Sequence, residues 1–369
     1  MNNPVIIVGA GLSGLRAASL LTAQGVKCRV LEARDRIGGR VLSTFDPNRP
    51  DLGKFDLGPT WFWPQYESHI ANLVKELKLE TFEQYKKGEI LLERFQIKPP
   101  ERCVLKENSD EKWVRLTGGV QSLIDALAET IPSEIVELET RVKKIHLNEA
   151  GDITVEAELS DGKMKKFPAD AVVLALPPRL VAHYIEFSPS LPPSLITDIV
   201  KKPTWMAGQA KAVAVYDRPF WRELGLSGYV LSAVGPLEEI YDASPNKGSG
   251  ALFGFFGMPP EARKKMGQDK ILQLVLNQLV KLFGSEAKNV KAIFYKDWSS
   301  DSETAVEEDF SPLKNYQSYG QPPVEGVWEK KIIFAGTETN SQYSGHLEGA
   351  LQSAEQAVFE IINLINIPL

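Results

Sequence analysis

Cysteine, histidine and long apolar runs are scarce in this chain of 369 residues, and each scarcity excludes a class of function. The two cysteines, Cys28 and Cys103, have neither metal-site nor redox-motif spacing. The histidines are scattered and form no metal-ligand pattern. We therefore expect no metal site and no dependence on disulfides, as is typical of a reducing, cytoplasmic setting.

Other absences exclude membrane spans and nucleic-acid partners. No apolar run is long enough to cross a bilayer, and the apolar segment 271–283 carries polar residues that favour an amphipathic helix. The first expected strand begins at residue 4, so we expect no signal peptide. The net charge of −6 is mixed in sign, with no basic stripe for nucleic acid.

The most informative pattern that is present lies near the N-terminus. An apolar strand over residues 5–8 runs into the sequence GAGLSG, which includes Ser13, and a helix over about 13–24 follows. Gly9 permits the turn, Gly11 lets the backbone approach a pyrophosphate, and Gly14 lets the helix pack on the strand. The helix would direct its N–H groups and positive dipole end at the phosphates.

The segment after this helix indicates which dinucleotide binds. A second strand ends at Glu32, at the usual offset for hydrogen bonds to the adenosine ribose, and this carboxylate would repel a 2′-phosphate. In the following loop, Gly38 and Gly39 allow close backbone approach and Arg40 can pair with phosphate in a bidentate way. The loop favours FAD, with a nicotinamide dehydrogenase as the alternative.

The rest of the chain predicts an α/β fold: a discontinuous Rossmann-like FAD-binding domain with an inserted α+β substrate-binding domain. The apolar run 171–176 predicts a buried parallel strand beside the first one. Residues 332–336 predict another buried strand, and a helix from His346 to about 365 closes the chain. We assign residues 1–60, 114–202 and 297–369 to the FAD-binding domain, and 61–113 and 203–296 to the substrate domain.

Lys211 is the most unusual single residue. It belongs to an expected strand over residues 209–216 whose two faces are both largely apolar. An interior lysine needs a partner or a function, because burying an unpaired charge is costly. The alternative is a lysine at a strand end that reaches solvent.

The chain resembles the flavin-containing monoamine and polyamine oxidase family. The resemblance rests on segments that occur in the family's order: GAGLSG, LEARDRIGGR, FDLGPTWFW, LTGGVQSL, ADAVVLALPP, AKAVAVYDRPFW, KDW and AGTETNSQYSGHLEGALQSAEQA. It implies an FAD-dependent oxidoreductase that oxidises a small-molecule amine to an imine. O2 would be the electron acceptor that reoxidises the flavin and gives H2O2.

The resemblance also implies where FAD lies. Glu32, Arg34 and Arg40 would hold the adenosine and the phosphates. The Gly345-His346-Leu347 segment would place a helix N-terminus at the flavin pyrimidine edge, where reduction develops negative charge. The other implied cofactor contacts are the backbone near Val142 for adenine, Glu338 for the ribityl-phosphate part, and Gly58, Pro59, Thr60, Trp61 and Gly336.

Three residues are candidates for catalysis. In family members, the lysine that matches Lys211 holds a water near flavin N5, and the tryptophan that matches Trp298 packs near the flavin. Ordinary core packing would equally explain Trp298. We expect Trp61 and Trp63 to lie near the cofactor or substrate, although hydrophobic packing alone would also explain these aromatic residues. The third candidate, His346, can act as an acid or base beside the flavin, or can cap its helix.

The sequence departs from the family at the amine site. His346 occupies the position of one of two aromatic walls, and Ala305 and Val306 lie where the second wall is expected. Because an amine between two ring faces is part of the family's selectivity, two alternatives stay open. One is another oxidase, dehydrogenase or desaturase chemistry on a non-amine substrate, and the other is a flavoprotein that binds without turnover.

Three further departures concern the cofactor and the surroundings of the site. No cysteine occurs in residues 304–307, so we expect FAD to be noncovalent. The first substrate segment, about 61–115, is shorter than in mitochondrial-type members and lacks their helical cap. Their C-terminal membrane tail is also missing, and we therefore expect a soluble enzyme with a more open or differently covered site.

Overall fold

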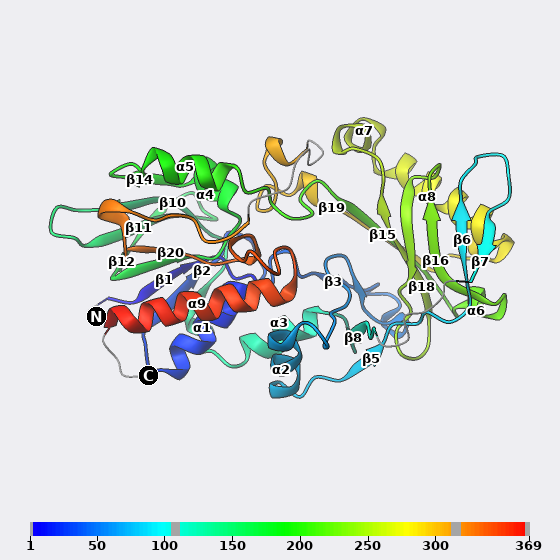
Figure 1. Ribbon diagram of the computed structural model, residues 1–369, viewed down its shortest axis with the longest axis horizontal. Helices are drawn as coiled ribbons and strands as arrows, with labels where there is room; N and C mark the ends of the chain where they lie inside the picture. The colour runs from blue at the N-terminus through cyan, green and yellow to red at the C-terminus, as the bar shows by residue number, and fades with distance from the viewer. Residues whose placement is uncertain (1–2, 105–110, 311–318, 366–369) are drawn as a thin grey trace.

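A five-stranded parallel sheet forms one end of the molecule (Figure 1). The structure is a computed structural model that describes residues 3–104, 111–310 and 319–365. The strand order is β20-β13-β1-β2-β9, and every pair is parallel. Val5 of β1 pairs with Ala171 of β13, which confirms the predicted neighbour of the first strand. The bounds are β1 Val5–Val8, β2 Cys28–Leu31, β9 Val136–Glu137, β13 Ala171–Leu174 and β20 Ile332–Phe334.

Both faces of this sheet are covered, which explains why β1, β13 and β20 are continuous apolar runs. Val5 and Ile7 pack against helices α1, α3 and α9, whereas Ile6 and Val8 face a four-stranded sheet, as alternation along a strand requires. Helices α1 and α9 lie side by side, although they are far apart in the sequence (Figure 1). The bounds are α1 Leu12–Ala23, α3 Gln121–Ala128, α9 Leu347–Ile365, β10 Thr140–Leu147, β11 Ile153–Leu159, β12 Met164–Ala169 and β14 Glu186–Ser188.

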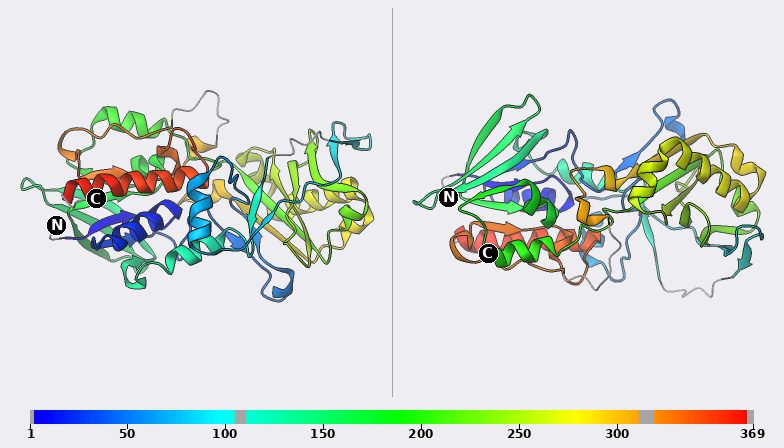
Figure 2. Two further views of the ribbon diagram at one scale, coloured as in Figure 1. Left: turned by 60° about the horizontal axis from the view of Figure 1, so that its bottom comes forward. Right: turned by 90° about the horizontal axis from the view of Figure 1, so that it is seen from above.

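A seven-stranded sheet forms the other end of the molecule, as both views of Figure 2 show. Helix α8 packs on one of its faces, and Phe55 and Leu57 pack on the other. Strands β6 and β7 bring residues 89–103 into the same sheet as the strands of residues 210–297. In sheet order the strands are β19 Ala292–Asp297, β15 Ala210–Tyr216, β18 Gly250–Phe256, β17 Leu237–Asp242, β16 Leu226–Ser232, β6 Glu89–Glu93 and β7 Glu101–Cys103, and α8 is Gln268–Phe283.

The parallel sheet and its helices confirm the predicted α/β class, while the proposed domain boundaries stay a prediction. None of the helices in the described ranges has both the length and the apolar character needed to cross a membrane. The remaining elements are α2 Ser68–Glu76, α4 Pro178–Tyr184, α5 Pro193–Val200, α6 Phe220–Glu223, α7 Pro260–Met266, β3 Ser43–Thr44, β4 Phe55–Asp56, β5 Thr81–Glu83 and β8 Val114–Leu116.

Candidate active site

A cavity of about 400 Å³ lies at the carboxyl ends of the parallel strands and continues toward the seven-stranded sheet. This is where open α/β sheets bind ligands, and the volume is in the usual range for small-molecule sites. All but two of the predicted site residues line it. The lining ones are Gly9, Gly11, Ser13, Glu32, Arg34, Gly39, Arg40, Gly58, Pro59, Thr60, Trp61, Val142, Lys211, Trp298, Gly336, Gly345, His346 and Leu347.

Two glycines of the turn differ in whether the protein itself leaves room for a side chain. A Cβ at Gly14 would lie 1.9 Å from the carbonyl oxygen of Gly9, so this glycine is required by packing, and it lies outside the cavity lining. Gly11 has an ordinary φ of −72°, and a Cβ there would meet no atom within 4 Å. The described protein therefore gives no steric reason for Gly11, and a ligand that approaches this backbone does.

Glu32 is fixed at the end of β2. One carboxylate oxygen accepts a hydrogen bond from the backbone N–H of Ala10 at 2.7 Å, and the other accepts from that of Arg34 at 2.9 Å. A carboxylate has about four acceptor sites, so these two bonds leave capacity for ribose hydroxyls. The site therefore fits the adenosine half of FAD.

The two arginines predicted to hold phosphates make ion pairs within the protein. Arg34 donates to Asp301 at 2.7 Å and to the Thr304 hydroxyl at 2.9 Å. Arg40 forms a bidentate pair with Glu338, at 2.6 and 2.9 Å. The Glu338 side chain is fully buried and lies outside the cavity lining, so it holds Arg40 at the wall of the cavity.

Replacing Arg40 with methionine should lower the free energy of unfolding by about 3 kcal/mol or more, because it leaves the Glu338 carboxylate buried without its cation. Urea unfolding in excess FAD measures the loss. The double variant R40M/E338M should recover part of it, since removing both charges also removes the uncompensated one. Equal stabilities of R40M and wild type would contradict this role.

Lys211 is buried, so the alternative in which it reaches solvent is wrong. Its Nζ donates to the carbonyl of Gly58 at 3.0 Å and to the hydroxyl of Thr60 at 2.6 Å. Nζ also lies 3.9 Å from the centre of the Phe253 ring. Burial lowers the pKa of Lys211 to about 7, an effect that the nearby Asp56 opposes. Lys211 is thus an amine at the cavity wall that can change charge near neutral pH.

The tryptophans form one side of the cavity. The indole N–H of Trp298 donates to the carbonyl of Leu57 at 3.1 Å, which orients its buried ring. Trp61 lies in an aromatic cluster, with its ring centre 4.9 Å from that of Trp113 and 5.1 Å from that of Tyr241. Trp63 extends the wall toward the start of α9.

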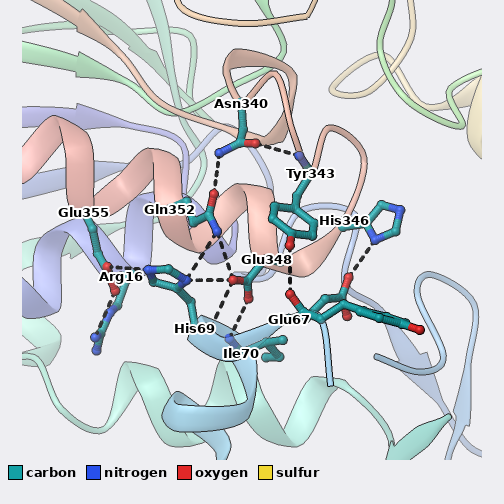
Figure 3. Close-up of polar contacts among 11 residues, drawn as sticks. Arg16, Glu67, His69, Ile70, Asn340, Tyr343, His346, Glu348, Gln352 and Glu355 are labelled. Atoms are coloured by element: carbon teal, nitrogen blue, oxygen red, sulfur yellow. Dashed lines mark hydrogen bonds and ion pairs between the residues drawn. The ribbon is translucent and has the colours of Figure 1, made fainter. Parts of the chain in front are cut away.

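His346 ends the loop before α9 and lines the cavity (Figure 3). Its Nδ1 lies 2.6 Å from a carboxylate oxygen of Glu67, and its ring centre lies 5.6 Å from that of Trp63. Glu67 precedes α2, also lines the cavity and is buried. Sequence reasoning missed Glu67, since no local pattern links it to a histidine so distant in the chain.

The second aromatic wall expected near residues 304–307 does not come from Ala305 or Val306, which are buried outside the cavity lining. Sequence reasoning missed three aromatic residues that do line it: Tyr184, Trp205 and Phe255. A Cβ at Gly345 would lie 2.3 Å from the Trp205 ring, so this glycine permits direct packing of that ring on the loop before α9.

Within the described ranges, no group of three His, Cys, Asp or Glu is placed to hold a metal.

The chain is similar in sequence to flavin-containing amine oxidases. A family model described as "Flavin containing amine oxidoreductase" matches residues 12–102 and 96–362. Putrescine oxidase of Kocuria rosea is 26% identical, over 97% of this chain and 95% of that protein. Amine oxidase [flavin-containing] B of Sus scrofa is also 26% identical, over 97% of this chain and 86% of that protein.

Solved structures share the fold. Putrescine oxidase bound to putrescine superposes with a TM-score of 0.78 at 22% identity, covering 98% of this chain and 99% of that one. Cyclohexylamine oxidase from Brevibacterium oxydans gives 0.79 at 21% identity and covers both chains completely.

The alignment with the Kocuria protein extends over 476 positions although this chain has 369 residues, so segments of that relative have no counterpart here. The two matched segments of the family model overlap at residues 96–102, which run from the loop after β6 into β7.

Proposed function

The chain belongs to the family of flavin-containing amine oxidoreductases, whose cofactor is FAD, and we propose that it oxidises the C–N bond of a small amine to an imine. Water would hydrolyse the imine, and O2 would take the electrons and yield H2O2. One observation carries this proposal. A single cavity is lined by Gly11, whose backbone has free space beside it, by the buried Lys211, and by the His346–Glu67 pair.

The chain has groups that would suit the pyrophosphate, the ribose and the pyrimidine edge of a noncovalent FAD. The Gly9–Gly14 turn and the start of α1 would present backbone N–H groups to the pyrophosphate, and Glu32 would accept from the ribose. When bound, FAD accepts two electrons from the substrate and passes them to O2. The N-terminus of α9 would stabilise the negative charge that this transfer develops at the pyrimidine edge.

The substrate side of the cavity has groups that suit an amine. Trp61, Trp63 and Phe255 line the cavity, and their rings would attract a cationic or polarised amine and displace water from around it. Lys211 is held in place by two hydrogen bonds and would present its charge where O2 is reduced. The names of the relatives, which act on putrescine or cyclohexylamine, support an amine without identifying it.

Product analysis over a panel of amines and amino acids tests the proposal. We expect at least one amine to be converted to the corresponding carbonyl compound, with one H2O2 formed for each C–N bond oxidised. Release of product without H2O2 would overturn the role of O2, and turnover of non-amine compounds alone would overturn the amine.

A non-amine substrate is the second candidate function. The observation in its favour is that His346, which the resemblance puts in place of a family aromatic wall, lines the cavity, while Ala305 and Val306 lie outside the cavity lining. Under this alternative, alcohols, nicotinamides or isoprenoids would reduce the flavin and amines would not.

A further inference from the structure

The starts of helices α2 and α9 meet and are linked by two histidine–glutamate pairs (Figure 3). In the first pair, Glu67 before α2 contacts His346 before α9. In the second, His69 of α2 contacts Glu348 of α9, again at 2.6 Å. The Glu348 carboxylate also accepts from two backbone N–H groups of α2. The pairs have the same chemistry and the same spacing, but only Glu67 and His346 line the cavity.

Glu67 is held in place on both oxygens. Its side chain is 3% exposed, one oxygen contacts His346, and the other accepts from the backbone N–H of Trp63 at 2.8 Å. A carboxylate with a separate contact on each oxygen keeps a fixed direction. Glu67 is therefore a rigid support for the imidazole.

This contact determines the tautomer of His346. In a pair with an ionised carboxylate, which can only accept, the hydrogen between the two side chains belongs to Nδ1. In the neutral ring, Nε2 then carries a lone pair, and no residue within the described ranges forms a hydrogen bond with it. The side chain is 39% exposed, so the ring can exchange a proton with solvent. His346 thus presents a proton acceptor to the cavity.

We propose that His346 removes a proton from the ammonium form of the substrate, with Glu67 as the positioning residue; this inference rests on the proposed function. Aliphatic amines are mostly protonated at neutral pH, and an ammonium nitrogen has no lone pair with which to assist C–N oxidation. One N–H bond of the ammonium breaks, its electron pair stays on nitrogen, and the proton binds Nε2. The resulting imidazolium is stabilised by Glu67, as in other carboxylate–histidine pairs.

Several other titratable groups surround this pair and must be separated from it in a pH profile. His69 and Glu348 form the neighbouring pair, and Tyr343 donates to the backbone of residue 66. Lys211 lines the same cavity from β15, where its Nζ donates to two oxygens of the loop that precedes Trp61. His69 offers a matched control, because it has the same partner type and distance but lies outside the cavity lining.

The test is the rate of flavin reduction by an amine under anaerobic conditions, followed over pH in FAD-loaded protein. For His346→Gln we expect a rate about 10²-fold below that of the wild type at pH 7, recovering as the pH approaches the pKa of the amine in solution. For Glu67→Gln the loss should be roughly tenfold, because the ring loses its fixed tautomer. His69→Gln should retain the wild-type profile. Visible flavin absorption checks that each variant is loaded.

A second measurement does not depend on turnover. The chain has four histidines, so selective 15N-histidine labelling can resolve each ring by NMR. We expect His346 to be the Nδ1–H tautomer in the wild type and a mixture of tautomers in Glu67→Gln. An Nε2–H tautomer in the wild type would overturn the inference.

The kinetic outcomes also separate this inference from the proposed function. A wild-type rate at pH 7 in His346→Gln, or a loss that is equal at every pH, would overturn the proton-acceptor role while leaving amine oxidation standing. If no amine reduces the wild-type flavin, the proposed function fails, and the inference fails with it.

Discussion

Replacing Gly11 with valine should strongly weaken FAD binding and change the stability of the apoprotein far less. A Cβ at this position meets no protein atom within 4 Å, and the backbone there is extended with an ordinary φ, so the protein leaves room for the first carbon of a side chain. The added methyl groups would instead occupy the space where the pyrophosphate approaches the turn. We expect FAD affinity to fall by more than about 10²-fold, equivalent to roughly 3 kcal/mol.

Gly14 provides the matched comparison for this prediction. A Cβ at Gly14 would lie 1.9 Å from the carbonyl oxygen of Gly9, so Gly14→Val should lower the Tm of the apoprotein as well as its FAD affinity. Calorimetric titration with FAD and thermal melts of the apoproteins measure both quantities. If Gly11→Val binds FAD like the wild type, the cofactor does not contact this turn.

Replacing Lys211 with methionine should slow the reaction of the reduced enzyme with O2 by about 10²-fold while leaving FAD bound. O2 gains negative charge as it is reduced, and a cation fixed at the cavity wall stabilises that charge. Stopped-flow mixing of the reduced enzyme with O2 measures the rate. Lys86→Met is the control, since Lys86 also lies over an aromatic ring but outside the cavity lining, and it should behave like the wild type.

The pH dependence of this reaction follows from the state of the Lys211 amine. Burial lowers its pKa to about 7, so the charged form, and with it the rate, should decrease as pH rises through this region. A negative charge on the bound, reduced cofactor would move the inflection upward. Lys211→Met should lack the inflection, and an unchanged reoxidation rate in this variant would contradict the role of Lys211.

Lys211 also affects the stability of the fold. Between pH 7 and 10.5, the unfolded chain carries a proton on this amine that the folded chain has lost. Stability therefore rises with pH across this window, and below it the folded state bears the cost of the buried cation. Lys211→Met should remove that rise and be more stable than the wild type at pH 6. A residue that lowers stability in this way is more readily explained by a chemical role than by packing.

The parts of the fold that were predictable from sequence are those encoded locally. Strands buried on both faces appear as continuous apolar runs, and the glycine turn is specified by the backbone approach that each glycine allows. The position of residues 171–174 beside β1 followed from these patterns and is confirmed. Helix ends were less exact, since α9 begins at Leu347 rather than at His346.

The parts of the site that were missed depend on contacts between distant segments. Glu67 and His346 come together because the starts of two helices meet. Trp205 reaches the site because its ring packs directly on Gly345. The pairing of Arg40 with Glu338 is another such case, because the sequence indicated a phosphate partner for that arginine. Side chains that pair across the fold leave no periodicity or spacing from which they could be inferred.

Anaerobic titration of the purified flavoprotein with amines and amino acids, followed by admission of air, tests amine oxidation most directly. We predict that at least one amine bleaches the visible flavin absorption in the absence of O2, and that air restores it with formation of H2O2. A flavin that no amine bleaches, but that an alcohol, nicotinamide or other non-amine compound reduces, would contradict the account.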